Sequence, residues 1–267
     1  MMENIRKYFK LVPILVLVVY LVVGNTPLIA QSFFQKAENN FAKRYEDFDG
    51  KYANKFYVNK AVKNYKRSEK TPDAIAALLR AYEFKASYTK QTKIVKKRIY
   101  KRAVDIGKKG MREYPNNIAL KYYYMTNLGR WGQTISVVKA TRKGILDEIK
   151  TINSELIQID STFDEAGPLR ILGAMHLKIP HIPLVLSWPS DEKALLFLRS
   201  SHRIAPLNAG NALLYAEALI KTGQEEKAKS LLENIIHRNP RKSRLLEDQK
   251  NINEARQLHN HLIASDQ

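Results

Sequence analysis

The sequence predicts an all-α fold, in which antiparallel helix pairs follow one another as an α-solenoid of about ten to twelve helices. One spacing recurs three times. It begins with a small residue, which is followed four and seven positions later by a small, branched or apolar residue, and a proline comes five positions after the last of these. The three copies are Ala103, Gly107, Gly110 and Pro115; Ala194, Leu198, Ser201 and Pro206; and Ala228, Leu232, Ile235 and Pro240. Composition agrees, because 45% of the 267 residues are hydrophobic and the 11 Gly and 10 Pro cluster at the expected turns.

The recurring spacing has a physical reason. Positions i, i+4 and i+7 share one helical face, so small residues there let a neighbouring helix approach, and the proline ends the helix. The last two copies lie 34 residues apart, which is the period of tetratricopeptide repeats (TPRs), and the spacing resembles their second helix. We therefore expect residues 31–267 to form a single TPR-like domain, with residues 243–264 as its C-terminal capping helix.

The expected repeat units differ in length. A degenerate first unit contains Ala61, Tyr65, Ser68 and Pro72. Helix ends are then expected at Pro72, Pro115, Ser161, Pro206 and Pro240. The first helix of a unit is marked by an apolar or aromatic residue followed by a small one, as in Leu128-Gly129, Leu172-Gly173 and Tyr215-Ala216. Within a unit, we count from the small residue that marks the first helix to the small residue that opens the recurring spacing of the second helix. This interval is nine residues longer in the fourth unit than in the fifth, which indicates an insertion between the two helices.

This insertion spans Lys178 to Ser190 and reads KIPHIPLVLSWPS. Its three prolines prevent a helix, yet its aliphatic residues and Trp188 make it too apolar for an ordinary solvated loop. We expect the loop, and Trp188 in particular, to be covered. It can fold over a gap between helices, close a ligand cavity as a lid, or form the self-association surface of a homo-oligomer.

Residues 1–30 have the pattern of an export signal peptide. Three cations precede a 13-residue apolar run from Leu11 to Val23, which is shorter than the roughly 20 residues that span a bilayer as a helix. We expect cleavage after Ala30, and an uncleaved inner-membrane anchor is the alternative. Either way, the body of the chain is expected in a bacterial periplasm. The sequence has no cysteine, which excludes disulfides, thiolate metal sites and a lipid-modified cysteine.

The formal net charge of +19 is unevenly distributed. Between Lys36 and Glu113 there are 22 Lys or Arg residues and 9 Asp or Glu residues. In a cytosolic protein this pattern, with its tyrosines, would indicate nucleic-acid binding, but the export signal argues against a nucleic-acid partner. Two interpretations remain: the lysines keep the outer face of the solenoid soluble, or they attract anionic lipid, envelope polysaccharide or an acidic partner.

The second half of the chain resembles a known family. Residues 167–206, GPLRILGAMHLKIPHIPLVLSWPSDEKALLFLRSSHRIAP, followed by ALLYAEALIKTGQEEKAKSLLENI, resemble the TPR-like T component associated with TRAP transporters (the TatT-like family). The resemblance extends from about Thr71 to the C-terminus, and the residues that carry it most specifically are Leu172, Gly173, Pro180, Pro183, Asp191 and Ala194. It implies an exported helical protein that can form small rings and pass small apolar or carboxylated ligands to a solute-binding protein.

No residue pattern indicates an enzyme. The sequence contains no Gly-rich phosphate loop and no Gly-x-Ser-x-Gly motif. His176 and His181 are five residues apart across the start of the proline-containing loop, rather than at the i, i+4 spacing of a helical metal pair. We therefore expect no catalytic residue, no metal and no cofactor.

The best candidate ligand site lies on the helix expected to start near Asn117. Tyr123, Asn127 and either Arg130 or Trp131 share one face of it. Aromatic rings beside an arginine suit an apolar carboxylate, while an aromatic core stripe between helices is the alternative interpretation.

Three more residues complete the candidate set. Arg170 lies on an otherwise apolar helix, so its charge must reach solvent, a ligand or a carboxylate such as Asp160, Asp164 or Glu165. His181 and Trp188 belong to the inserted loop, which would meet a ligand if it served as a lid.

The sequence thus predicts an exported, non-enzymatic binding protein. By resemblance, its leading role is that of an accessory to TRAP-type solute uptake, which binds a small apolar or carboxylated ligand or a periplasmic solute-binding protein. The alternative is an envelope scaffold that binds another protein through its concave face, as repeat arrays commonly do.

Overall fold

The computed structural model describes residues 32–182 and 186–265, so the expected export signal lies outside it. A first helix covers residues 32–42. The others are α2 (Lys55–Arg67), α3 (Pro72–Tyr88), α4 (Lys93–Glu113), α5 (Ile118–Gln133), α6 (Val137–Arg142), α7 (Ile145–Asp160), α8 (Phe163–Lys178), α9 (Asp191–Ile204), α10 (Ala209–Lys221), α11 (Glu225–Ile236), the 3-10 helix η1 (Lys242–Arg244) and α12 (Leu245–Ser265). Only isolated β-bridges accompany them in these ranges. The all-α prediction is confirmed.

The helix bounds follow local sequence signals. Side chains of Thr71, Thr92, Asn117, Ser190 and Asn208 cap the N-termini of α3, α4, α5, α9 and α10 by accepting hydrogen bonds from backbone N–H groups that lack a helical partner. Helices α4, α9 and α11 end shortly before the prolines that were expected to stop them. In the unit without such a proline, α7 ends directly before Ser161, as predicted.

The recurring positions predicted from the sequence are buried. They lie on α4, α9 and α11, each of which packs against the helix before it in its pair. The buried residues are Ala103, Gly107, Gly110, Ala194, Leu198, Ser201, Ala228, Leu232 and Ile235. Burial at these nine positions supports the predicted register.

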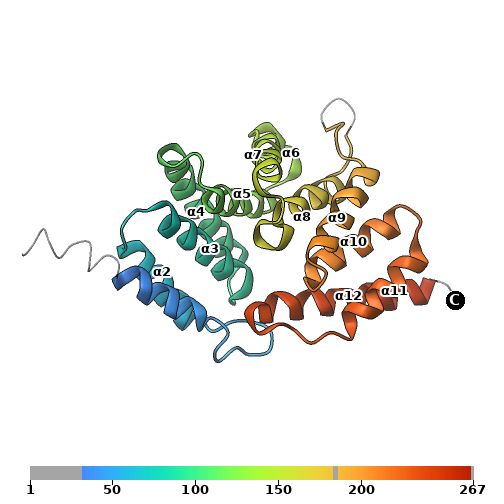
Figure 1. Cartoon of the computed structure of the whole chain (residues 1–267), viewed down its shortest axis with the longest axis horizontal. Helices are drawn as coiled ribbons and strands as arrows, with labels where there is room; N and C mark the ends of the chain where they lie inside the picture. Colours follow the sequence, from blue (N-terminus) through green and yellow to red (C-terminus); the bar gives the residue numbers. More distant parts are fainter. Residues whose placement is uncertain (1–31, 183–185, 266–267) are drawn as a thin grey trace, which may run out of the picture.

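Successive helices pack against one another along the chain, and α3 also contacts α5 while α10 contacts α12. This order is compatible with an α-solenoid (Figure 1). The unequal units arise from a 21-residue α4, from the short α6 between α5 and α7, and from the loop between α8 and α9. No helix in residues 32–182 or 186–265 is long and apolar enough to cross a membrane.

The two ends of the curved array meet (Figure 1). The guanidinium of Arg44 donates a 2.8 Å hydrogen bond to the carbonyl of Ser243, and the Tyr45 hydroxyl donates a 2.7 Å bond to Glu247. Gln249 of α12 donates to the Gly50 carbonyl at 3.1 Å. These contacts join segments about 200 residues apart in sequence, so the array encloses a central space.

We predict that Gly173→Leu and Ala228→Leu each destabilise the fold by ~1–3 kcal/mol through overpacking. A Cβ on Gly173 would lie 2.5 Å from Cγ of Leu198 and 3.2 Å from its backbone nitrogen, and Ala228 is fully buried. Thermal and urea melts measure the effect, with Lys108→Leu on the exposed face of α4 as the control that introduces the same side chain. An Ala228→Leu protein that melts like the parent would show that the assigned register is wrong.

Candidate ligand-binding cavity

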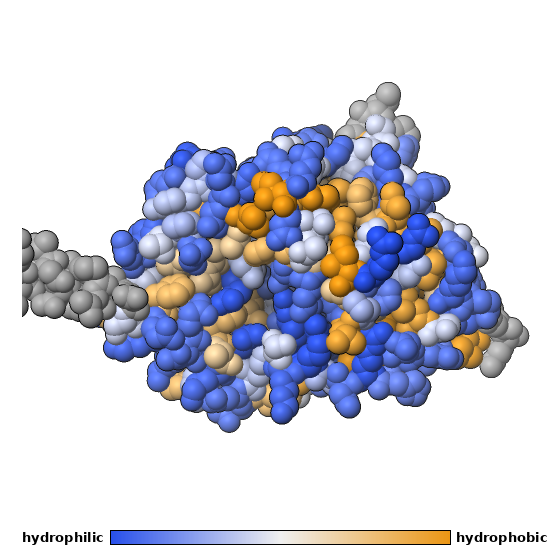
Figure 2. Space-filling view, viewed as in Figure 1, coloured by the Kyte–Doolittle hydropathy of each residue, from blue (hydrophilic) through white to orange (hydrophobic). Residues whose placement is uncertain are grey.

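A cavity of about 900 Å³ lies within the arc of helices. Residues of α3, α5, α6, α7, α8, α10 and α12 line it, together with the end of the first helix. Seen from the side of Figure 1, the surface is hollowed between the N-terminal and C-terminal helices (Figure 2). The volume lies within the range of small-molecule sites.

One part of the cavity wall is apolar. It is formed by the inward faces of α5, α7 and α8, and its residues are Met125, Ile145, Leu146, Ile149, Ile171 and Met175. Most of these side chains also pack into the main hydrophobic core. We call this part the apolar bay. Four of its residues are at most 8% exposed, so it is mainly Leu146 and Ile171 that present a surface to a hydrocarbon or aromatic group.

Beside the bay, Arg130 and Tyr123 of α5 present polar atoms to the cavity. Arg130 Nε donates to Glu83 at 3.3 Å and Nη1 lies 3.5 Å from Gln133 Oε1, while Nη2 has no hydrogen-bond partner in the described ranges. Burial opposes the charge of Arg130, but Glu83, Tyr88 and Tyr100 together outweigh it and raise the pKa, so the cation is retained. A guanidinium has five N–H donors, and some of them therefore stay available.

Tyr123 remains protonated and forms part of an aromatic cluster. Burial, with Asp164 as the next contribution, raises the pKa of its hydroxyl to about 12. Its ring stands edge-on to Tyr122 and Phe163 at 5.2 and 6.4 Å. The hydroxyl makes no hydrogen bond with the described residues, so it can donate to an acceptor in the cavity.

The start of α8 contains an unusual backbone. Asp164, Glu165 and Ala166 have φ values of 48°, 60° and 61°, and none of them is glycine. Each such residue is disfavoured by roughly 1–2 kcal/mol for a chiral side chain. The right-handed part of α8 follows with Pro168, whose ring suits the first turn of a helix. Three consecutive strained residues require strong compensating contacts.

Those contacts are ion pairs and hydrogen bonds to distant segments. Asp164 accepts from the Tyr122 hydroxyl at 2.6 Å and from Arg170 at 3.3 Å, and it also pairs with Arg244. Glu165 pairs with Arg241 at 3.0 Å, and its backbone carbonyl accepts from Asn211 at 2.9 Å. We call this set, Tyr122, Asp164, Glu165, Arg170, Asn211, Arg241 and Arg244, the α8 ion cluster.

The α8 ion cluster keeps Asp164 ionised. Burial alone would raise the pKa of this carboxyl, but Arg244, Arg170 and the hydrogen bond from Tyr122 together lower it by more than burial raises it. The Asp164 side chain is only 12% exposed. Removing one partner of such a pair leaves a buried charge without compensation. The resulting loss of folding stability is typically larger than the net stability that the intact pair contributes.

The structure brings three of the seven candidate site residues to the cavity: Tyr123, Arg130 and Arg170. Arg170 pairs with Asp164, the structural alternative considered from the sequence. Asn127 instead lies in the core, where its amide donates to the carbonyls of Leu79 and Tyr123.

The other three candidates lie away from the cavity lining. Trp131 is half-buried beneath Lys101, whose Nζ is 5.5 Å from the ring centroid. His181 is exposed. Trp188 stands edge-on to His176 of α8 at 5.1 Å and under Lys150 of α7.

Among the described residues of the inserted loop, Lys178 and Ile179 at its start line the cavity, and the others do not. Ile182 and Leu186 exchange backbone hydrogen bonds of 2.9 and 2.7 Å, and Leu186 is 2% exposed. Pro183, Leu184 and Val185 lie outside the described residues. With Trp188 packed on α7 and α8, the described part of the loop fits the interpretation in which it fills a gap between helices.

Sequence reasoning missed several residues of the cavity wall. They are Arg44, Arg80, Arg241, Arg244 and Glu247. Their spacing along the chain carries no motif, because they meet only when the ends of the array close. The sequence did contain one signal, the unexplained charge of Arg170 on an apolar helix. Its partner Asp164 also pairs with Arg244.

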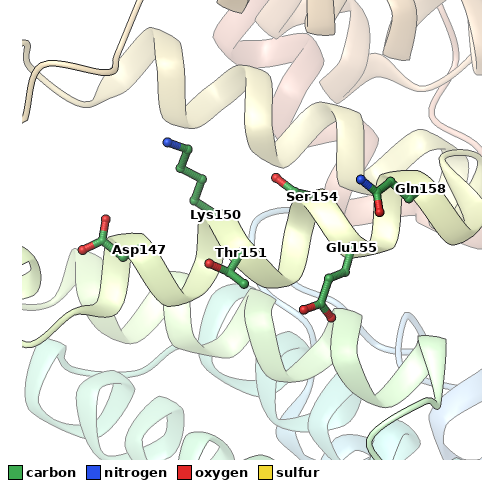
Figure 3. Close-up of a pocket in the computed structure, with 6 residues that line it drawn as sticks. All are labelled: Asp147, Lys150, Thr151, Ser154, Glu155 and Gln158. Atoms are coloured by element: carbon green, nitrogen blue, oxygen red, sulfur yellow. The ribbon is translucent and has the colours of Figure 1, made fainter.

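A second, shallower hollow of about 410 Å³ is a weaker candidate. Its residues all come from α7 (Figure 3): Asp147, Lys150, Thr151, Ser154, Glu155 and Gln158. Glu155 already pairs with Lys121 at 2.6 Å, and Lys150 lies over Trp188. No cluster of three or more potential metal ligands occurs in the parts of the chain that the structure describes.

Comparison with protein-family models and with curated proteins gives no match to this sequence.

We predict that Asp164→Asn destabilises the protein by about 3–5 kcal/mol, because it leaves Arg170 and Arg244 without their shared anion. Urea denaturation measures the change. Asp105→Asn is the matched control, since Asp105 pairs with Lys101 in an exposed position and such pairs contribute about 0–1 kcal/mol. Equal losses in the two variants would contradict the central role of the α8 ion cluster.

The same pair predicts a pH dependence. The pKa of Asp164 is lowered in the folded protein, so its contribution is complete above the unfolded-state pKa of about 3.9 and is lost as the pH falls through the folded-state pKa. The stability difference between the parent and Asp164→Asn should therefore be constant near neutral pH and shrink below about pH 4. A difference that does not change between pH 6 and pH 3 would contradict this assignment.

Proposed function

We propose that this chain is a non-enzymatic binding protein that takes a small amphipathic carboxylate into the central cavity. The observation that carries the proposal is the adjacency of the apolar bay to Arg130, which keeps guanidinium donors unused. An apolar wall with a few convergent polar groups is typical of ligand sites.

The proposed ligand lies with its apolar end in the bay and its carboxylate at Arg130 and Tyr123. Burial of the apolar end supplies most of the favourable free energy, in proportion to the area removed from water. A charge-assisted hydrogen bond from Arg130 to the carboxylate fixes the orientation. The other arginines named above pair with carboxylates or backbone carbonyls of the protein itself, as Arg130 does with Glu83. Arg130 is assigned to the ligand because it lies beside the apolar bay.

The wider role proposed is that of an exported TPR-like accessory of solute uptake. The export signal and the resemblance to the TRAP-associated T component support it, and the partner would be a periplasmic solute-binding protein. Burial of the repeat positions on α4, α9 and α11 supports the TPR-like part of the proposal.

An envelope scaffold is the second candidate. It is favoured by apolar side chains left in solvent on α9 and the turn that follows it, where Leu196 and Leu207 are 50% and 69% exposed. Such residues can anchor a protein partner. The ligand experiment distinguishes the two, because a scaffold needs no small molecule in the cavity.

We predict that decanoate raises the melting temperature of the protein and that decan-1-ol, with the same chain but no carboxylate, binds at least tenfold more weakly. The expected ratio follows from a charged hydrogen bond worth about 1.5–3 kcal/mol. Isothermal titration calorimetry measures both constants. Arg130→Gln should abolish the preference for the acid, whereas Arg199→Gln, at an exposed site on α9, should retain it.

Two outcomes would contradict the proposal in different ways. Equal affinity of the parent for acid and alcohol would remove Arg130 from the site. If neither decanoate nor a set of aromatic carboxylates binds at millimolar concentration, the cavity does not serve this class of ligand.

A further inference from the structure

Helices α2 and α4 carry a large positive charge that the fold does not neutralise. α2 contains five Lys or Arg residues and no acidic residue, and α4 contains nine with only Asp105 and Glu113. Their buried faces are apolar or small, so most of the cations are on the outer faces. Lys101 with Asp105 is the one ion pair that these cations make within residues 32–182 and 186–265.

Cations from three helices converge around Lys85 of α3. Burial lowers the pKa of this half-buried lysine, and Lys66 and Lys55 of α2 and Arg102 of α4 lower it further. Lys66 also lies over the ring of Tyr82, one turn before Lys85, at 5.8 Å. No carboxylate in the described ranges pairs with Lys85. A like-charge group of this kind is a place where an external anion is favoured.

Two exposed apolar side chains lie at the same end of these helices. Phe56 and Ile94 are 52% and 72% exposed, each in the first turn of its helix. The bridge between Ala53 and Thr89, with a 2.8 Å bond from the Ala53 N–H to the Tyr88 carbonyl, holds the start of α2 beside the end of α3. Phe56 and Ile94 follow the bridged residues by three and five positions, which limits how far apart they can lie.

The apolar residues are surrounded by lysines. Lys60 Nζ lies 4.0 Å from the centroid of the Phe56 ring, and Lys93 directly precedes Ile94. A surface that combines cations with protruding apolar side chains matches the boundary of an anionic bilayer, where head groups attract the cations and apolar groups enter the layer beneath. A soluble polyanion offers no such layer.

We propose that this basic face, defined by Lys55, Phe56, Lys66, Lys85, Ile94 and Arg102, docks the protein on the surface of an anionic lipid bilayer. The inference is independent of the cavity and goes beyond ligand binding. It places one side of α2, α3 and α4 against the bilayer, with Phe56 and Ile94 in its head-group region.

The absence of cysteine from the sequence allows a local test on the mature chain expected after cleavage, residues 31–267. An environment-sensitive fluorophore attached at Phe56→Cys reports whether this point enters a bilayer, and the same label at Ile263→Cys on α12, where the native side chain is 43% exposed, is the control. With vesicles of equal phosphatidylglycerol and phosphatidylcholine in 0.05 M salt, we expect a blue shift at position 56 and none at 263. The shift should largely disappear at 0.5 M salt because of screening.

Charge-reversal variants test the role of the cations. In the Phe56→Cys background, Lys66→Glu with Arg102→Glu should raise the lipid concentration needed for half of the shift by tenfold or more, since each cation near an anionic surface contributes substantially. Lys221→Glu with Lys242→Glu changes the net charge equally on exposed residues of the C-terminal half and should have little effect. Three results would overturn the proposal: equal shifts with pure phosphatidylcholine, equal effects of both double variants, or the same shift on adding heparin without lipid.

Discussion

The strained start of α8 and the ion cluster that holds it are the constraint on which the rest of the architecture depends. Three consecutive left-handed residues without glycine would not persist alone. They persist because Asp164 and Glu165 reach Arg241 and Arg244 near the start of α12 as well as Arg170 on α8. The turn therefore fixes the position of α8 relative to the C-terminal helices, and with it one wall of the cavity.

Closure of the array completes this wall. The contacts of Arg44 and Tyr45 with Ser243 and Glu247 bring the first and last helices together, so side chains that would otherwise face open solvent line a shared cavity. Partial desolvation makes an unpaired charge costly there. This explains why the cavity arginines bind protein carboxylates or carbonyls. Arg130 follows the same rule through Glu83, and it keeps guanidinium donors that no described residue accepts from.

Burial that depends on residue spacing along one helix could be predicted from the sequence. Contacts that form only when the two ends of the array meet could not. Ala228, Leu232 and Ile235 are predictable because one helical face determines their burial. Arg244 and Asp164 are 80 positions apart in the sequence, and no motif around either residue indicates that the two pair. The left-handed turn was equally hard to predict, since an Asp such as Asp164 visits this region only singly, and Glu165 and Ala166 have no preference for it. Asn127 was grouped with Tyr123 as a candidate ligand residue, and only the packing of α3, whose Leu79 carbonyl accepts from its amide, shows that Asn127 lies in the core.

The charged residues of this protein fall into two groups, one buried and paired, the other solvated and largely unpaired. Inside the cavity, cations and anions are paired because burial makes each unpaired charge expensive, so their presence is explained by folding. On α2 and α4 the cations are solvated and largely unpaired, and folding requires neither their number nor their common sign. Like charges around Lys85 even oppose the compact state. An excess that the fold does not need is better explained by an interaction outside the molecule, and the exposed Phe56 and Ile94 beside it favour a bilayer over a soluble polyanion.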